Sequence, residues 1–201
     1  MIFTDTIKAA ITLALKTHEL HQKQKRRGKD VPYIVHPLIV GMLLARAGAS
    51  DEVIAAGILH DTIEDSHPLV PVTPSSIQKQ FGKKIAQLVL SVTENKKLKT
   101  YEARKRESIR RIKRLSHESL LIRSADTLSN ITELLSDIEH LGPRALESFG
   151  GTRGAVLQNH LESICEIQER GRVTGVNPFI DELCEHKKKL KILIDALQTD
   201  A

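Results

Sequence analysis

The sequence is poor in aromatic residues: Phe, Trp and Tyr make up 3% of its 201 residues, and Trp is absent. The core must therefore be built mainly from Leu, Ile, Val and Ala, a mixture that favours helix-on-helix packing over sheets. Hydrophobic residues make up 40% of the chain and charged residues 27%, which is typical of a folded protein rather than a disordered one. A chain of this length can bury one core, so we expect a single domain over residues 1–201.

Long apolar runs are also absent, so the sequence predicts neither a membrane-spanning helix nor a signal peptide. The two cysteines, Cys165 and Cys184, lack zinc-type spacing, which favours reduced thiols and a cytoplasmic location. The net charge of +5 and the pI near 9.2 indicate an anionic partner. Because no basic run is interleaved with aromatics for base stacking, we expect a phosphorylated small molecule, and neither nucleic acid nor a membrane.

Apolar residues recur at helical spacing along most of the chain, and no pair of segments alternates as strands would. Ser50 is a good N-cap for a helix that runs past Leu59 into an acidic segment, and Thr73-Pro74 starts another that ends near Gly82. Further helices are expected at 36–48, 85–92, 101–115, 120–141, about 152–170 and about 178–198. A first helix is expected to place on one face Ile7, Ile11, Leu15 and His18. We therefore expect an all-α fold, a helical bundle.

The acidic segment His60-Asp61-Thr62-Ile63-Glu64-Asp65 is the densest group of metal-binding and acid–base side chains. On the expected helix, His60 and Glu64 share one face, and Asp61 and Asp65 share the neighbouring one. Taken alone, the segment is equally compatible with a polar helix end whose imidazole bonds to the backbone.

Two further residues favour a metal site. His36 opens a separate helix, and Asp126 lies within an apolar helix, where a carboxylate is costly unless it is paired or bound to a cation. Singly, Asp126 is also explained by an ion pair with Arg123 or Arg110, and His36 by a hydrogen-bonded core position. Together with the histidine and aspartate that open the acidic segment, they supply two imidazoles and two carboxylates. That set suits Mn²⁺ or Fe²⁺, with Zn²⁺ as an alternative.

These residues and their flanks resemble the HD phosphohydrolase superfamily. More narrowly, they resemble the hydrolase domain of the RelA/SpoT alarmone enzymes and the stand-alone small alarmone hydrolases. The matching segments are PYIVHPLIVG, AAGILHDTIED, FGKKIAQLVLSVTE, YEARKRESI and LLIRSADTLSN, in family order over about residues 21–160. The C-terminal helices at 161–201 lie outside this motif-bearing core. The family fold is an all-helical bundle, in agreement with the periodicity.

The resemblance implies removal of the 3′-pyrophosphate from ppGpp or pppGpp, releasing GDP or GTP and pyrophosphate. It also implies a stand-alone degrading enzyme, because the synthetase and regulatory regions of the family are not in the sequence. The metal ligands that it implies, for Mn²⁺, are His36, His60, Asp61 and Asp126. The residues that would assist hydrolysis are Glu64 and Asp65. The substrate contacts that it implies are Arg26, Arg27, Arg104, Lys105 and Asn130.

Several positions near the nucleotide depart from the family pattern. Lys23 stands where the family often has Gly, Thr127 follows the motif aspartate where Lys or Arg is usual, and Thr132 stands where Arg is frequent. These departures leave the base open, so the alternatives are another nucleotide such as (p)ppApp, or a non-catalytic nucleotide-binding module. A pure binder has no need of both a metal set and an acid pair, which favours the enzyme. The sequence also leaves a homo-oligomer open.

Overall fold

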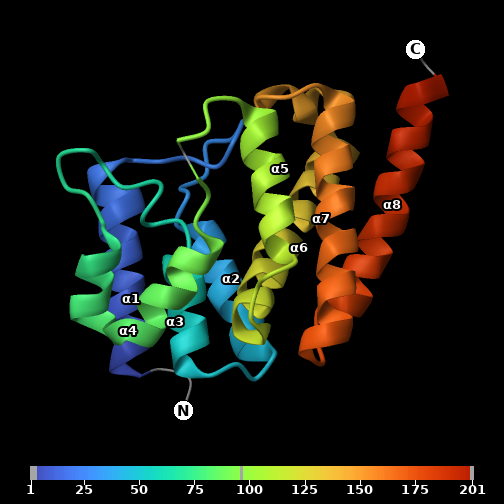
Figure 1. The fold of residues 1–201 in the computed structure, drawn as a ribbon. Helices are drawn as coiled ribbons and strands as arrows, with labels where there is room; N and C mark the ends of the chain where they lie inside the picture. Colours follow the sequence, from blue (N-terminus) through green and yellow to red (C-terminus); the bar gives the residue numbers. More distant parts are fainter. Residues whose placement is uncertain (1–3, 96, 200–201) are drawn as a thin grey trace.

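The computed structural model describes residues 4–95 and 97–199, and over these ranges the protein is helical with no strand (Figure 1). The predicted all-α fold is therefore confirmed. The α-helices are α1 (Asp5–Leu15), α2 (Val35–Arg46), α3 (Asp51–Leu59), α4 (Pro74–Val92), α5 (Tyr101–Ile112), α6 (His117–Leu141), α7 (Arg153–Thr174) and α8 (Ile180–Thr199). A π-helical segment, η1 (Lys16–His21), extends α1, and a 3₁₀ segment, η2 (Gly142–Ser148), follows α6.

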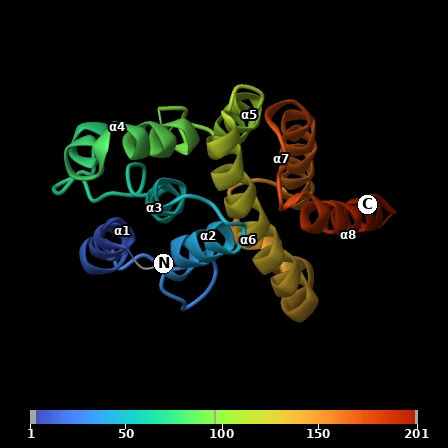
Figure 2. The same cartoon turned by 90° about the horizontal axis from the view of Figure 1, so that it is seen from below.

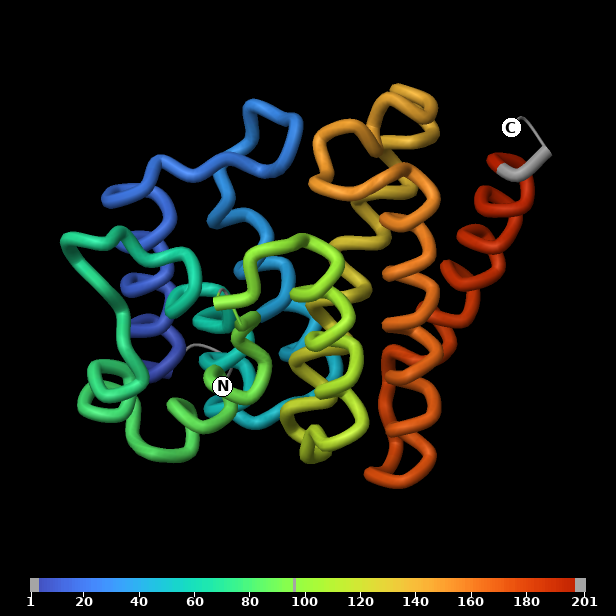
Figure 3. Tube along the Cα trace, turned by 45° about the horizontal axis from the view of Figure 1, so that its top comes forward, coloured from blue at the N-terminus to red at the C-terminus, as the bar shows by residue number. Residues whose placement is uncertain are grey.

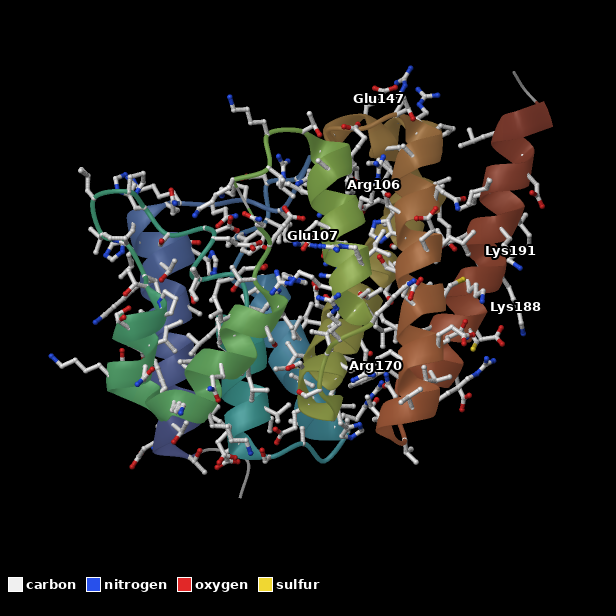
Figure 4. All side chains as sticks on the ribbon, in the orientation of Figure 1. Arg106, Glu107, Glu147, Arg170, Lys188 and Lys191 are labelled. Carbon is white, nitrogen blue, oxygen red and sulfur yellow. The ribbon has the colours of Figure 1, made fainter. Side chains whose placement is uncertain are left out.

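Helix α6 lies in the middle of the bundle, between α2 and α3 on one side and α7 and α8 on the other (Figure 2). Among the largest fully buried side chains of the described residues, Phe179 is aromatic and the others are Leu or Ile, as the composition predicts. On the outer side of α8, Lys188 and Lys191 point away from the bundle (Figure 4). No helix in the described ranges combines the length and the apolar character that crossing a bilayer would require.

The helix boundaries follow from local chemistry. At the start of α4, the Thr73 hydroxyl accepts the Ser76 amide at 3.1 Å and the Ser76 hydroxyl accepts the Thr73 amide at 2.9 Å. Gly82, at φ 86°, kinks α4 where the sequence predicts a break, and Gly142, at φ 65°, ends α6. Ser50 stands at the N-cap of α3, but its side chain makes no capping bond to the backbone.

The predicted face of the first helix is wrong at Leu15, whereas its two ends, Ile7 and His18, are buried. Ile7 is buried, but Leu15 is 40% exposed, and the buried positions of α1 after Ile7 are Ala10 and Ala14. The π-helical turn η1 begins at Lys16, after Leu15, so its wider turn changes the spacing only of the side chains that follow. His18, on this turn, is completely buried.

Lys23, in the loop after η1, has φ 48°, the left-handed region in which a side chain is strained. Among the described residues it is the only one other than glycine with a positive φ. This is the position where the resembling family often has glycine, so the departure seen in the sequence has a backbone cost.

We expect Lys23→Gly to stabilise the protein by about 0.5–1 kcal/mol, because glycine adopts this φ without a Cβ clash. Thermal unfolding measures the effect as a higher midpoint. Lys25→Gly, in the same loop at a residue with ordinary φ, is the matched control and should lower the midpoint instead. A lower midpoint for Lys23→Gly would contradict the assignment of strain to this residue.

Candidate metal centre

Three elements bring two histidines and two aspartates together. His36 comes from the first turn of α2, His60 and Asp61 follow the end of α3, and Asp126 comes from the middle of α6. His36 Nε2 lies 3.3 Å from His60 Nε2 and 3.3 Å from Asp126 Oδ1, and His60 Nε2 lies 3.7 Å from Asp126 Oδ1. Asp61 Oδ2 lies 2.9 Å from His60 Nε2 and 3.9 Å from His36 Nε2.

The donor set fits a divalent metal ion. His36, His60 and Asp126 form a buried group whose ligand atoms all lie within 4.8 Å of one another. His60 Nδ1 lies 2.7 Å from the Gly57 carbonyl and must donate to it, which leaves the Nε2 lone pair facing the cluster. His36 Nδ1 lies 3.1 Å from Ser129 Oγ, so its Nε2 also faces the cluster. Ligands about 2.1 Å from an ion lie roughly 3 Å apart, close to these separations.

The electrostatics of the cluster also favour a cation. Burial lowers the pKa of His60, but Asp61 and Asp126 outweigh burial and raise that pKa to about 10. Burial raises the pKa of Asp126, but the hydrogen bond to His36 and the charges of His60 and Arg123 bring it well below its ordinary value. The two carboxylates thus attract positive charge to the point between the imidazoles, whether a proton or a metal supplies it.

Hydrogen bonds from outside the cluster orient its carboxylates. The Tyr33 hydroxyl donates to Asp61 Oδ2, and the Asn130 amide donates to Asp126 Oδ1 at 2.6 Å. Arg123 Nη1 lies 3.1 Å from the other Asp126 oxygen, Oδ2. The ion pair considered as an alternative explanation of Asp126 therefore coexists with the cluster, since the two oxygens face different partners. The other alternative partner, Arg110, pairs with Glu107.

The expectation that the acidic segment continues a helix is wrong. Helix α3 ends at Leu59, and residues 60–65 form turns. The buried Thr62 hydroxyl donates to the Leu59 carbonyl at 2.7 Å and so competes for the acceptor that would continue the helix. The turn sends Glu64 and Asp65 to different neighbours instead of placing them on adjacent faces of one helix.

Glu64 and Asp65 each have a defined partner. The Glu64 carboxylate accepts the backbone amide of Glu94, in the loop before α5. Burial, together with the charges of Asp61 and Asp65, raises the pKa of Glu64 to about 9. Asp65 Oδ2 accepts from the Gln24 side chain at 2.9 Å.

Two of the predicted substrate contacts are joined to Glu64 through Glu94. Arg104 Nε and Lys105 Nζ, at the start of α5, lie 3.3 Å and 2.8 Å from the two carboxylate oxygens of Glu94. The backbone amide of Glu94 thus donates to Glu64, while the Glu94 carboxylate pairs with Arg104 and Lys105. The sequence did not single out this glutamate.

The other predicted contacts divide into two places. Arg26 Nη2 donates to Asn130 at 2.9 Å and pairs with Glu133, so Asn130 links Arg26 to Asp126. The Arg27 guanidinium instead lies over the Phe149 ring at 4.9 Å, where the loop around Gly28 approaches the 142–152 segment (Figure 3).

Comparison with known proteins agrees with this geometry. The family model for the HD domain matches residues 10–147. The chain belongs to the HD domain family. An Aquifex aeolicus guanosine-3′,5′-bis(diphosphate) 3′-pyrophosphohydrolase is 37% identical over 119 residues, covering 58% of this chain and 16% of that protein. The zebrafish (Danio rerio) protein MESH1, named for the same activity, is 34% identical over 119 residues, covering 58% of this chain and 63% of MESH1. The matched region thus spans less than two thirds of each of these relatives.

A solved structure of a metazoan SpoT ortholog, described as hydrolysing ppGpp, has a TM-score of 0.74 to this HD domain protein at 23% identity. The match covers 93% of this chain and 96% of the ortholog. At that identity the match establishes a shared fold. It covers more of this chain than the HD domain model, which matches residues 10–147.

Sequence reasoning missed the residues that orient the cluster, above all Tyr33, Ser129 and Glu94. Ser129 lies three residues after Asp126 on α6, so helical spacing was the available signal for it. Tyr33 lies in the turn before α2 and contacts Asp61, so no spacing indicated it. Glu94 had no such signal, since it contacts Glu64 through its backbone amide.

Proposed function

We propose that this HD domain protein is a Mn²⁺-dependent pyrophosphohydrolase that removes the 3′-pyrophosphate of ppGpp and pppGpp. The observation that carries the proposal is the buried cluster of His36, His60, Asp61 and Asp126, flanked by two acids and by paired cations. The relatives named for this activity, at 34–37% identity, support the same substrate class.

The reaction forms a bond from water to phosphorus, breaks the bond from phosphorus to the ribose 3′-oxygen and puts a proton on that oxygen. When bound, a divalent ion supplies charge that polarises the phosphate and acidifies water. Asp65 orients the water and accepts its proton. In the metal-free protein, burial and the charges of Asp61 and Asp65 raise the pKa of Glu64 to about 9, and we assign to Glu64 the proton that is delivered to the departing oxygen.

Arg104 and Lys105 would receive the pyrophosphate. In the structure both contact Glu94, whose carboxylate occupies the cations that an anionic substrate needs. A pyrophosphate group carries more negative charge than one carboxylate and would compete successfully for them. Asn130 contacts the Asp126 oxygen that Arg123 leaves free, and Arg26 contacts Asn130; we assign these two residues to the nucleoside.

The test is a panel of ppGpp, pppGpp, ppApp and ordinary nucleotides incubated with Mn²⁺, Fe²⁺ or Zn²⁺ and scored for released pyrophosphate. We expect pyrophosphate and GDP from ppGpp, with the highest rate in Mn²⁺. Hydrolysis of ppApp but not ppGpp would contradict the guanosine assignment. Metal binding without turnover of any compound would favour the nucleotide-binding module.

A further inference from the structure

A second set of side chains lies beside the metal cluster, on the π-helical turn η1 and the loop that follows it. Figure 1 shows this loop leading from the top of α1 toward α2. His18, on the π-helical turn, is completely buried, and its ring packs on Tyr33 with centroids 4.9 Å apart. The Tyr33 ring lies in turn 5.7 Å from that of His36. His18 is thus separated from the cluster by a single side chain. A π-helical turn is rare and is frequently retained at functional sites.

A chain of hydrogen bonds joins His18 to Asp65. His18 Nδ1 lies 2.8 Å from Gln24 Oε1, and Gln24 Nε2 lies 2.9 Å from Asp65 Oδ2. A second glutamine, Gln22, donates to the Asp65 backbone carbonyl at 2.7 Å. The two glutamines flank Lys23, whose backbone is left-handed, and both of their side chains contact the same aspartate.

The chemistry of the groups fixes the direction of these bonds. A carboxylate only accepts, so Gln24 must turn its amide nitrogen to Asp65 and its amide oxygen to His18. His18 Nδ1 must then carry a proton. Its Nε2 has no partner among the described residues, as suits an unprotonated ring nitrogen. Burial lowers the pKa of His18 more than the bond to Gln24 raises it, so the ring is neutral near pH 7.

We infer that His18 and Gln24 are positioning residues for Asp65: the Nδ1–H of His18 holds the Gln24 amide, and that amide fixes the rotation of the Asp65 carboxylate. The inference rests on the proposed function, in which Asp65 orients water. Because a general base must lie within hydrogen-bond reach of its proton, a carboxylate turned away from that orientation loses rate without losing substrate.

The kinetic test uses His18→Phe, which keeps a ring against Tyr33 but removes the donor, and Gln24→Leu. We expect each to lower kcat about 10-fold or more, with KM and Mn²⁺ affinity changed less than about twofold. Because the two residues act in series, the double variant should be no slower than Gln24→Leu. His18→Asn, whose amide places a donor at the position of Nδ1, should restore most of the rate. His21→Phe, on the same π-helical segment, is the matched control and should leave kcat unchanged.

Additive losses in the double variant, failure of His18→Asn to restore the rate, or a loss confined to KM or Mn²⁺ affinity would each overturn the inference. A second measurement is independent of activity: ¹⁵N imidazole spectra at neutral pH, with His18 assigned from His18→Phe. We expect a neutral ring protonated at Nδ1, and a loss of that preference in Gln24→Leu. A ring protonated at Nε2 would overturn the inferred hydrogen bond from His18 to Gln24. If the wild-type protein hydrolyses no alarmone, the proposed function fails. The spectra still decide whether His18 donates to Gln24.

Discussion

Asp126→Ala should abolish metal binding and turnover together. Its Oδ1 faces both imidazoles of the cluster and is oriented by Asn130. Removing it leaves two imidazoles and Asp61, and we expect Mn²⁺ affinity to fall at least about 100-fold and kcat/KM at least about 1000-fold. Calorimetric titration with Mn²⁺ and pyrophosphate release from ppGpp measure the two effects.

The control for this change is Glu139→Ala, an exposed carboxylate on the same helix α6, which should bind Mn²⁺ and turn over normally. Asp126→Asn serves as a second variant, because it keeps the side-chain shape beside Arg123 if the alanine variant folds poorly. Wild-type Mn²⁺ affinity in a folded Asp126→Asn protein would show that the ion binds elsewhere.

The helices were predictable because their signals are local. The period of the apolar residues located α6, Gly142 marked its end, and Thr73-Pro74 marked the start of α4. The π-helical turn after α1 was not predictable in this way. It alters the helical spacing from Lys16 onward, and it carries His18, whose ring packs against Tyr33, fifteen residues further along the chain.

The residues that form the site were more predictable from the sequence than the hydrogen bonds between them. A carboxylate within the apolar stripe of α6 pointed to Asp126, and the structure brings it to both histidines. The acidic segment was assigned to a helix because its metal-binding and acidic residues are four positions apart. In the structure the Thr62 hydroxyl bonds to the Leu59 carbonyl, and the helix ends before this segment. Glu94, which reaches Glu64 through its backbone amide, carries no side-chain pattern that a sequence would reveal.

Glu64→Gln should keep the metal and lose turnover. The Glu64 carboxylate accepts the Glu94 amide, an interaction that the amide oxygen of Gln preserves. The substitution removes the proton that we assign to the departing oxygen, so we expect kcat to fall about 100-fold or more. Thermal stabilisation by Mn²⁺ should be equal in the two proteins. A wild-type kcat would remove Glu64 from the mechanism.

The same variant tests the electrostatics of the metal-free protein. Because folding raises the pKa of Glu64 from 4.5 to about 9, its contribution to stability is greatest at low pH and is lost as pH rises toward the folded pKa. At pH 7 the unfolding free energy of the wild-type protein has therefore fallen by up to about 3 kcal/mol relative to low pH. Glu64→Gln, which carries no titrating group at this position, does not lose this contribution. We expect the gap in unfolding free energy between the variant and the wild type to widen steadily from about pH 5 to about pH 9.

Glu52→Gln is the matched control for the pH series. Hydrogen bonds to the Ser50 side chain and to the backbone lower the pKa of Glu52, so its charge stays constant over the same range. The gap for this control should therefore be flat. A flat gap for Glu64→Gln as well would mean that Glu64 is ionised in the folded protein. The proton for the 3′-oxygen would then have to come from another group, and Glu64 and Asp65 would compete for the same role as base.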